Sequence, residues 1–167
     1  MSEAICYVEA FKVDIPPEIA AILDGAAAPY SEPRQAEQAL SAALQRAPDN
    51  LGLRIAAYAF YFYKNRLWEA IPHAEACLAS AAAALALPQD WRMVSSESAR
   101  FSELEQPQRV YLKSLVALGY CRARLGDFEG GEALLRKAAS LDPQDLLGAA
   151  ALATLVARRN GEDDDEE

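Results

Sequence analysis

The chain has 167 residues and a formal net charge of -9, and 52% of its residues are hydrophobic, with alanine a large part of that share. This length is enough for one domain or a short repeat array. Alanine favours helices and lets them pack closely, so we expect an all-α fold. No basic patch offsets the acidity, which argues against binding nucleic acid through its phosphates.

The N-terminal segment 1–30 is expected to form an arm with one short helix. Met1–Lys12 has no basic region before an apolar core, so the pattern of a secretory signal is missing. The longest apolar run, Cys77–Leu87, is shorter than the roughly 20 residues that span a bilayer. The three cysteines are Cys6, Cys77 and Cys121. They form no Cys-x-x-Cys pair, which fits reduced thiols in a cytoplasm. We therefore expect a cytoplasmic protein without membrane contacts.

Two helices are predicted in the next part of the chain. The first runs from Ser31 to Ala47 and is ended by Pro48, and the second begins at Leu51 and runs to about Tyr63. Aromatic rings crowd the end of the second helix. They cannot share one stripe, because successive side chains turn by about 100°. The rings are those of Tyr58, Phe60, Tyr61, Phe62 and Tyr63. Some of them are expected to face a partner, and the alternative is that they pack against the insert and the N-terminal arm.

An alanine-rich helix is predicted after the turn at 64–66 and should continue to Leu87. Pro72 lies early in this helix and is expected to bend it. His73 is the single histidine and is predicted to face solvent. With Cys77 it would supply two ligands, whereas zinc sites use three or four protein ligands, so we expect no metal site.

An insert at about 84–107 separates this helix from the next one. Its aromatic and sulfur-containing residues include Trp91 and Met93, and Ser98–Glu105 is predicted to add a short helix. Unstructured loops of this length inside a domain are uncommon and often functional.

The clearest pattern follows the insert. Pro107 begins a long helix through Arg124, and a second helix follows and ends before Pro143. Leu146–Arg159 is then expected to be an amphipathic capping helix, followed by a disordered acidic tail at 160–167.

The clusters Leu118-Gly119, Leu125-Gly126-Asp127-Phe128 and Leu141-Asp142-Pro143 have the spacing of a tetratricopeptide repeat, a helix–turn–helix of about 34 residues. Segment 31–159, apart from the insert, resembles this family. The resemblance implies a short right-handed superhelix of antiparallel helical hairpins, with about six to eight helices and a capping C-terminal helix. The resemblance also places Gly119 where the two helices of this repeat cross, and a side chain there would push them apart. Arg122 and Gly131 depart from the family pattern, which favours tyrosine and alanine at these positions.

In this family the first helix of each repeat lines a concave groove. The side chains at matching positions, which we expect to bind a partner, are Ile55, Phe62, Tyr63, Lys113, Tyr120 and Arg124. Aromatic rings beside cations are favoured in protein interfaces. The groove is therefore predicted to bind another protein or a peptide.

The run Leu51–Leu78 also resembles small tetratricopeptide proteins encoded near bacterial nitrogen-fixation genes. We expect a non-enzymatic interaction module, either an adaptor or an assembly chaperone, that needs no cofactor. Two alternatives remain open. One is a self-associating homodimeric subunit, and the other is an accessory factor for nitrogenase maturation.

Overall fold

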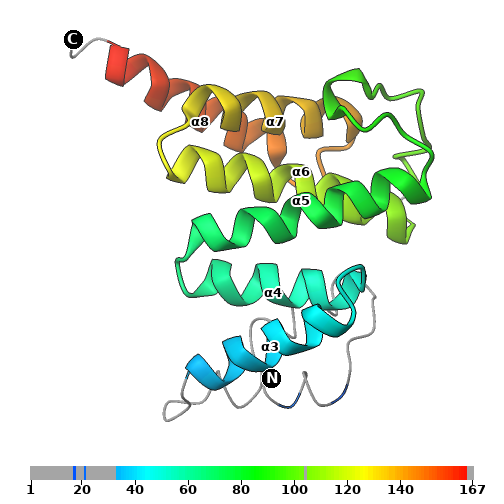
Figure 1. Cartoon of the computed structure of the whole chain (residues 1–167). Coiled ribbons are helices and arrows are strands. Elements are labelled where there is room, and N and C mark those ends of the chain that lie inside the picture. Colours follow the sequence, from blue (N-terminus) through cyan, green and yellow to red (C-terminus); the bar gives the residue numbers. More distant parts are fainter. Residues whose placement is uncertain (1–16, 18–20, 22–32, 104, 165–167) are drawn as a thin grey trace. The chain divides into compact units, whose positions relative to one another are not determined.

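The structure is a computed structural model that describes residues 17, 21, 33–103 and 105–164. In this part of the chain every regular element is a helix, which confirms the all-α prediction (Figure 1). The elements are α3 (Pro33–Arg46), α4 (Leu51–Tyr63), α5 (Leu67–Ala84), the 3-10 helix η1 (Trp91–Met93), α6 (Gln106–Arg124), α7 (Phe128–Leu141) and α8 (Ala149–Asp164). None of these helices is both long and apolar enough to cross a membrane. The predicted N-terminal arm lies almost wholly outside the described residues.

The chain divides into two compact units, residues 1–77 and 78–167, and the division falls within α5. In the first unit, α3 buries one stripe of apolar residues spaced by three and four positions: Ala36, Leu40 and Ala43. Asn50 begins α4, because its side chain accepts a hydrogen bond from the Leu53 N–H at 2.9 Å. Helix α4 is apolar along most of its length and is buried on most of its sides.

A tight turn joins α4 to α5, as the sequence predicted. Asn65 has a φ of 56°, in the left-handed region, and the Lys64 N–H donates to the Phe60 carbonyl. Helix α5 ends at Ala84 rather than at Leu87, because Ala86 adopts a φ of 52° that a helix cannot continue. Pro72 lies inside α5 near its start.

In the second unit, α6 and α7 form an antiparallel hairpin that crosses at two glycines. A Cβ placed on Gly119 would lie 2.7 Å from Cγ of Leu135 and 3.0 Å from the Gly131 carbonyl oxygen. A Cβ on Gly131 would lie 2.7 Å from the Gly119 carbonyl oxygen. The backbones therefore approach too closely for any side chain at either position, as the sequence predicted for Gly119.

The turn between α6 and α7 and the start of α7 also follow local rules. Gly126 has a φ of 95°, which only glycine adopts without strain, and the Asp127 side chain caps α7 by accepting from the Gly130 N–H at 2.9 Å. Helix α7 then packs against both α6 and α8 (Figure 1). The second unit thus has a three-helix core around α7.

The last helix differs from the prediction at both ends. It begins at Ala149 rather than Leu146, because Asp145 and Gly148 have φ values of 49° and 67° and the buried Asp142 carboxylate accepts from the Leu147 N–H. It also continues to Asp164, so residues 160–164 are helical where the sequence predicted disorder. The final residues 165–167 lie outside the described part.

We predict that Gly119→Ala destabilises the second unit by about 1–3 kcal/mol, because the new methyl group overpacks against Leu135 and the Gly131 backbone. Thermal unfolding followed by circular dichroism should show a midpoint lower by roughly 2–4 °C per kcal/mol. Gly161→Ala in α8 is the matched control. Nothing lies within 4 Å of its added Cβ, so its midpoint should stay level or rise. Equal midpoints for Gly119→Ala and the wild type would contradict the close crossing.

Candidate functional site

Helix α6 leaves one narrow stripe partly exposed. Between Val110 and Cys121 every residue is buried except Lys113, Val116 and Tyr120, which are half-buried. These residues are spaced by three and four positions and therefore share one face of the helix. Arg124 continues the same face in the last turn and is exposed. The face that the repeat register predicted for binding is thus the accessible face of α6.

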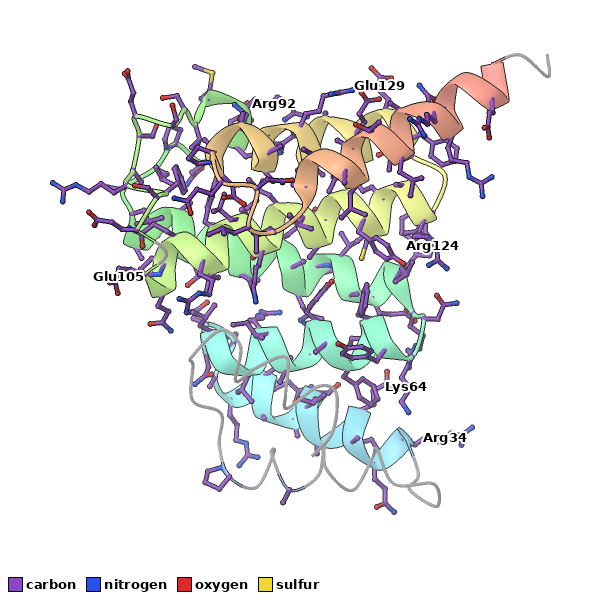
Figure 2. All side chains as sticks on the ribbon, turned by 180° about the vertical axis from the view of Figure 1, so that it is seen from behind. Arg34, Lys64, Arg92, Glu105, Arg124 and Glu129 are labelled. Atoms are coloured by element: carbon purple, nitrogen blue, oxygen red, sulfur yellow. The ribbon has the colours of Figure 1, made fainter. Side chains whose placement is uncertain are left out.

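Two side chains of this stripe are held together. Nη1 of Arg124 donates a hydrogen bond of 2.7 Å to the Tyr120 hydroxyl, and its guanidinium lies 5.6 Å from the centre of the Tyr120 ring. Figure 2 labels Glu105 at the start of α6 and Arg124 at its other end. Burial lowers the pKa of Lys113, and the charge of Arg109 one turn earlier adds to this effect. Lys113 and Arg124 lie about 16 Å apart along the helix, with Tyr120 between them.

The predicted binding residues of α4 behave differently. Ile55 is 1% exposed, so the structure places it in the core rather than on an accessible surface, and its contact with a partner stays a prediction. The reason is that α4 is apolar on nearly every side, and helical periodicity alone cannot then select the accessible face. Tyr63 is 44% exposed, and its ring packs edge-on against Phe62 with 5.4 Å between centres. The continuous groove that would join α4 to α6 stays a prediction.

A polar network in the first unit surrounds Tyr61. The Tyr61 hydroxyl donates to Glu37, and Arg66 makes two hydrogen bonds to the same carboxylate, at 2.7 and 3.0 Å. The Arg66 guanidinium also lies 4.9 Å from the centre of the Tyr61 ring and contacts Glu69. Hydrogen bonds from Arg66 hold the pKa of Glu37 below its usual value. The pKa of Tyr61 is raised, mainly by burial and then by its hydrogen bond to Glu37. The network ties α3 to the α4–α5 hairpin.

His73 belongs to the same region and is not the solvent-facing residue that the sequence predicted. Its ring stacks on Tyr61 with 5.6 Å between centres, and its Nδ1 lies 3.2 Å from Nη1 of Arg54. Burial, and then the charge of Arg54, lower the pKa of His73 to about 4. One turn later, burial raises the pKa of Cys77 to about 12, so its thiol is inert near neutral pH. No group of His, Cys, Asp or Glu within the described ranges could hold a metal ion.

The insert is ordered by contacts from a distant helix. The Lys137 ammonium of α7 donates to the carbonyls of Arg92 and Val94, at 3.1 and 2.8 Å. Val94 and Phe101 are buried, and the Phe101 ring packs 5.8 Å from the ring of Tyr111 on α6. Residues 98–103 form only turns, bends and irregular backbone, so the short helix predicted over Ser98–Glu105 is wrong.

Two exposed side chains were not anticipated from the sequence. Met93, on η1, is 71% exposed and follows Trp91, whose ring is covered by the Arg92 guanidinium at 4.5 Å. Trp68, on α5, is also 71% exposed. The exposure of Trp68 could have been predicted from helical spacing. The buried residues of this helix recur every three or four positions and leave position 68 off their face: Leu67, Ala70, Ala74 and Cys77.

Comparison with known proteins gives one informative relative. No protein-family model matches the chain, and no solved structure matches it. The sequence is 33% identical over 154 residues to the uncharacterised 19.8 kDa protein in the nifW 5′ region of Azotobacter chroococcum mcd 1. The match covers 91% of this chain and 85% of that protein. The chain belongs to the family of that protein. This relative supports the expected association with a nitrogen-fixation gene region, while membership of the tetratricopeptide family stays a prediction.

We predict that protonation of His73 contributes to acid sensitivity. Its folded pKa of about 4 lies below the ordinary value of 6.5, so the unfolded chain takes up the proton first as the pH falls. The stabilising contribution is complete above pH 6.5 and is lost progressively as the pH falls towards 4. Denaturant unfolding at pH 7 and 5 should show a smaller loss of stability for His73→Gln than for the wild type. An identical loss in both proteins would contradict the assignment.

We also predict that Lys137 holds the insert closed. Lys137→Met removes two charge-assisted hydrogen bonds to the backbone of the insert, so chymotrypsin should cleave near Trp91 about tenfold faster. Arg136→Met is the neighbouring control, because Arg136 is exposed and pairs with Glu132 within α7. Equal cleavage rates for the two variants would show that Lys137 does not hold the insert.

Proposed function

We propose that this protein is an interaction module in nitrogen fixation, either an adaptor or an assembly chaperone, and that the exposed stripe of α6 binds an acidic segment of a partner protein. The observation that carries the proposal is the Tyr120–Arg124 pair at the accessible end of that stripe. The nitrogen-fixation context is supported by the relative in the nifW 5′ region.

The pair has the properties of an interface anchor. Tyrosine and arginine are enriched among the residues that dominate binding energy, because each combines a large flat contact area with directional hydrogen bonds. The 2.7 Å hydrogen bond already restricts both side chains, so less conformational entropy is lost on binding. The Arg124 guanidinium retains further N–H donors that could pair with a carboxylate.

The charges along the stripe favour an acidic partner segment. Lys113 lies two turns before Tyr120 and Arg124 one turn after it, so a cation flanks the ring on each side. The half-buried Val116 supplies an apolar contact between Lys113 and Tyr120. A peptide with carboxylates about 16 Å apart and an apolar side chain between them would match all three features.

Direct binding measurements test this proposal. The immobilised chain is presented with purified nitrogenase component proteins and with the nifW product, each on its own. We predict that one of them binds the wild type, and that Tyr120→Ala with Arg124→Ala weakens binding by about thirtyfold or more. Circular dichroism of the double variant should match the wild type, because both side chains are at least partly exposed.

Arg136→Ala serves as the matched control. It removes an exposed arginine from α7 that pairs only within its own helix, so binding should be unchanged. The proposal is wrong if none of these proteins binds the wild type. It is also wrong if the double variant binds as tightly as the Arg136→Ala control.

A further inference from the structure

Tyr111, on α6, is buried against the insert with a hydroxyl group that has no partner. The residue is 1% exposed, and its ring packs against the ring of Phe101 in the insert. Within the described residues its hydroxyl oxygen makes no hydrogen bond and is not accessible to water. Burial, and then the charge of Asp90 in the first part of the insert, raise the pKa of Tyr111 to about 12. Two separate parts of the insert therefore lie near this side chain.

A second polar atom of α6 is in the same state. Oε1 of Gln108, one turn before Tyr111, is also inaccessible to water and accepts no hydrogen bond within the described ranges. Side chains of a helix point back towards its N-terminus, so the Tyr111 ring extends over the turn that contains Gln108. A hydrogen-bond donor and an acceptor thus lie on neighbouring turns, both dry and not bonded to each other.

These two atoms oppose closure of the insert. In water both would have hydrogen bonds, and burial removes those bonds without replacing them. Nearly all buried polar atoms in native proteins are paired, so two unpaired atoms one turn apart mark a place where the closed arrangement is strained. Moving the insert away from Tyr111 would give water access to its hydroxyl.

Other contacts hold the insert in place. Val94 and Phe101 are 1% and 3% exposed, and the Lys137 ammonium donates to the carbonyls of Arg92 and Val94. Residues 94–103 contain no helix, so they can move without breaking a regular element. The insert runs between α5 and α6, both of which continue beyond it (Figure 1). Its position thus depends on a few contacts that act against the unpaired atoms beneath it.

We infer that the insert is a lid over Tyr111, held closed by Lys137 and by its own buried side chains, and biased towards opening by the unpaired Tyr111 hydroxyl. The inference does not depend on partner binding by α6. Tyr111 is a core residue and does not belong to the exposed stripe of that helix.

Hydrogen exchange of backbone amides, measured by NMR and corrected for intrinsic exchange rates, tests the lid. In the wild type the amides of Val94 and Ser98, which donate within the insert, should exchange at least about tenfold faster than those in the middle of α7. This difference is expected because the lid opens while the α6–α7 hairpin stays folded. Equal protection of the two sets would overturn the inference, since the insert would then open only when the whole unit unfolds.

Tyr111→Phe tests the role of the hydroxyl, because it removes that group and keeps the ring that packs on Phe101. The amides of Val94 and Ser98 should then exchange about tenfold more slowly, since exchange follows the population of the open state. Tyr61→Phe is the matched control. It removes a hydroxyl that is paired with Glu37 in the first unit, so exchange in the insert should not change.

Lys137→Met should have the opposite effect and speed exchange in the insert, because it removes the two bonds that hold the lid closed. Tyr111→Phe combined with Lys137→Met should lie between the two single variants. Exchange in Tyr111→Phe that is as fast as in the wild type, or faster, would overturn the inference, because the hydroxyl would then not oppose the closed insert.

Discussion

The close crossing of α6 and α7 is the constraint on which the second unit depends. Gly119 and Gly131 bring the two backbones within contact distance, so each carbonyl oxygen occupies the space that a side chain would need on the other helix. Helix α7 can then also pack against α8 and place Lys137 under the backbone of the insert. The same packing buries the opposite sides of α6 and leaves accessible the stripe that contains Tyr120. A local glycine requirement thereby determines which side of α6 stays accessible.

Local signals in the sequence predicted much of this architecture. The bounds of α4 follow from the Asn50 cap and the turn after Tyr63, and those of α6 from Pro107 near its start and Gly126 after its end. The accessible stripe of α6 was also predictable, because Lys113, Val116 and Tyr120 occupy the groove positions of the repeat register and are half-buried in the structure. The same register selected Ile55, which the structure buries in the core, because α4 is apolar along most of its length.

The features that sequence could not supply depend on contacts between distant residues. Lys137 bonds to carbonyls more than 40 residues earlier, and no local pattern indicates that pairing. His73 was predicted to face solvent, but it stacks on Tyr61 and contacts Arg54 instead. The extension of α8 to Asp164 runs against the repulsion expected among its acidic residues and against the helix dipole. For Lys137 and His73, tertiary contacts outweigh the local preference.

The central claim is that α6 presents Tyr120 and Arg124 to a partner protein, and site-specific photo-crosslinking in nitrogen-fixing cells tests it most directly. A photoreactive phenylalanine analogue replaces Tyr120 in one strain and Arg136, on the exposed side of α7, in another. The account predicts a covalent adduct with one defined protein of the nitrogen-fixation system from position 120 and none from position 136. The same adduct from position 136, or no adduct from position 120, would contradict it.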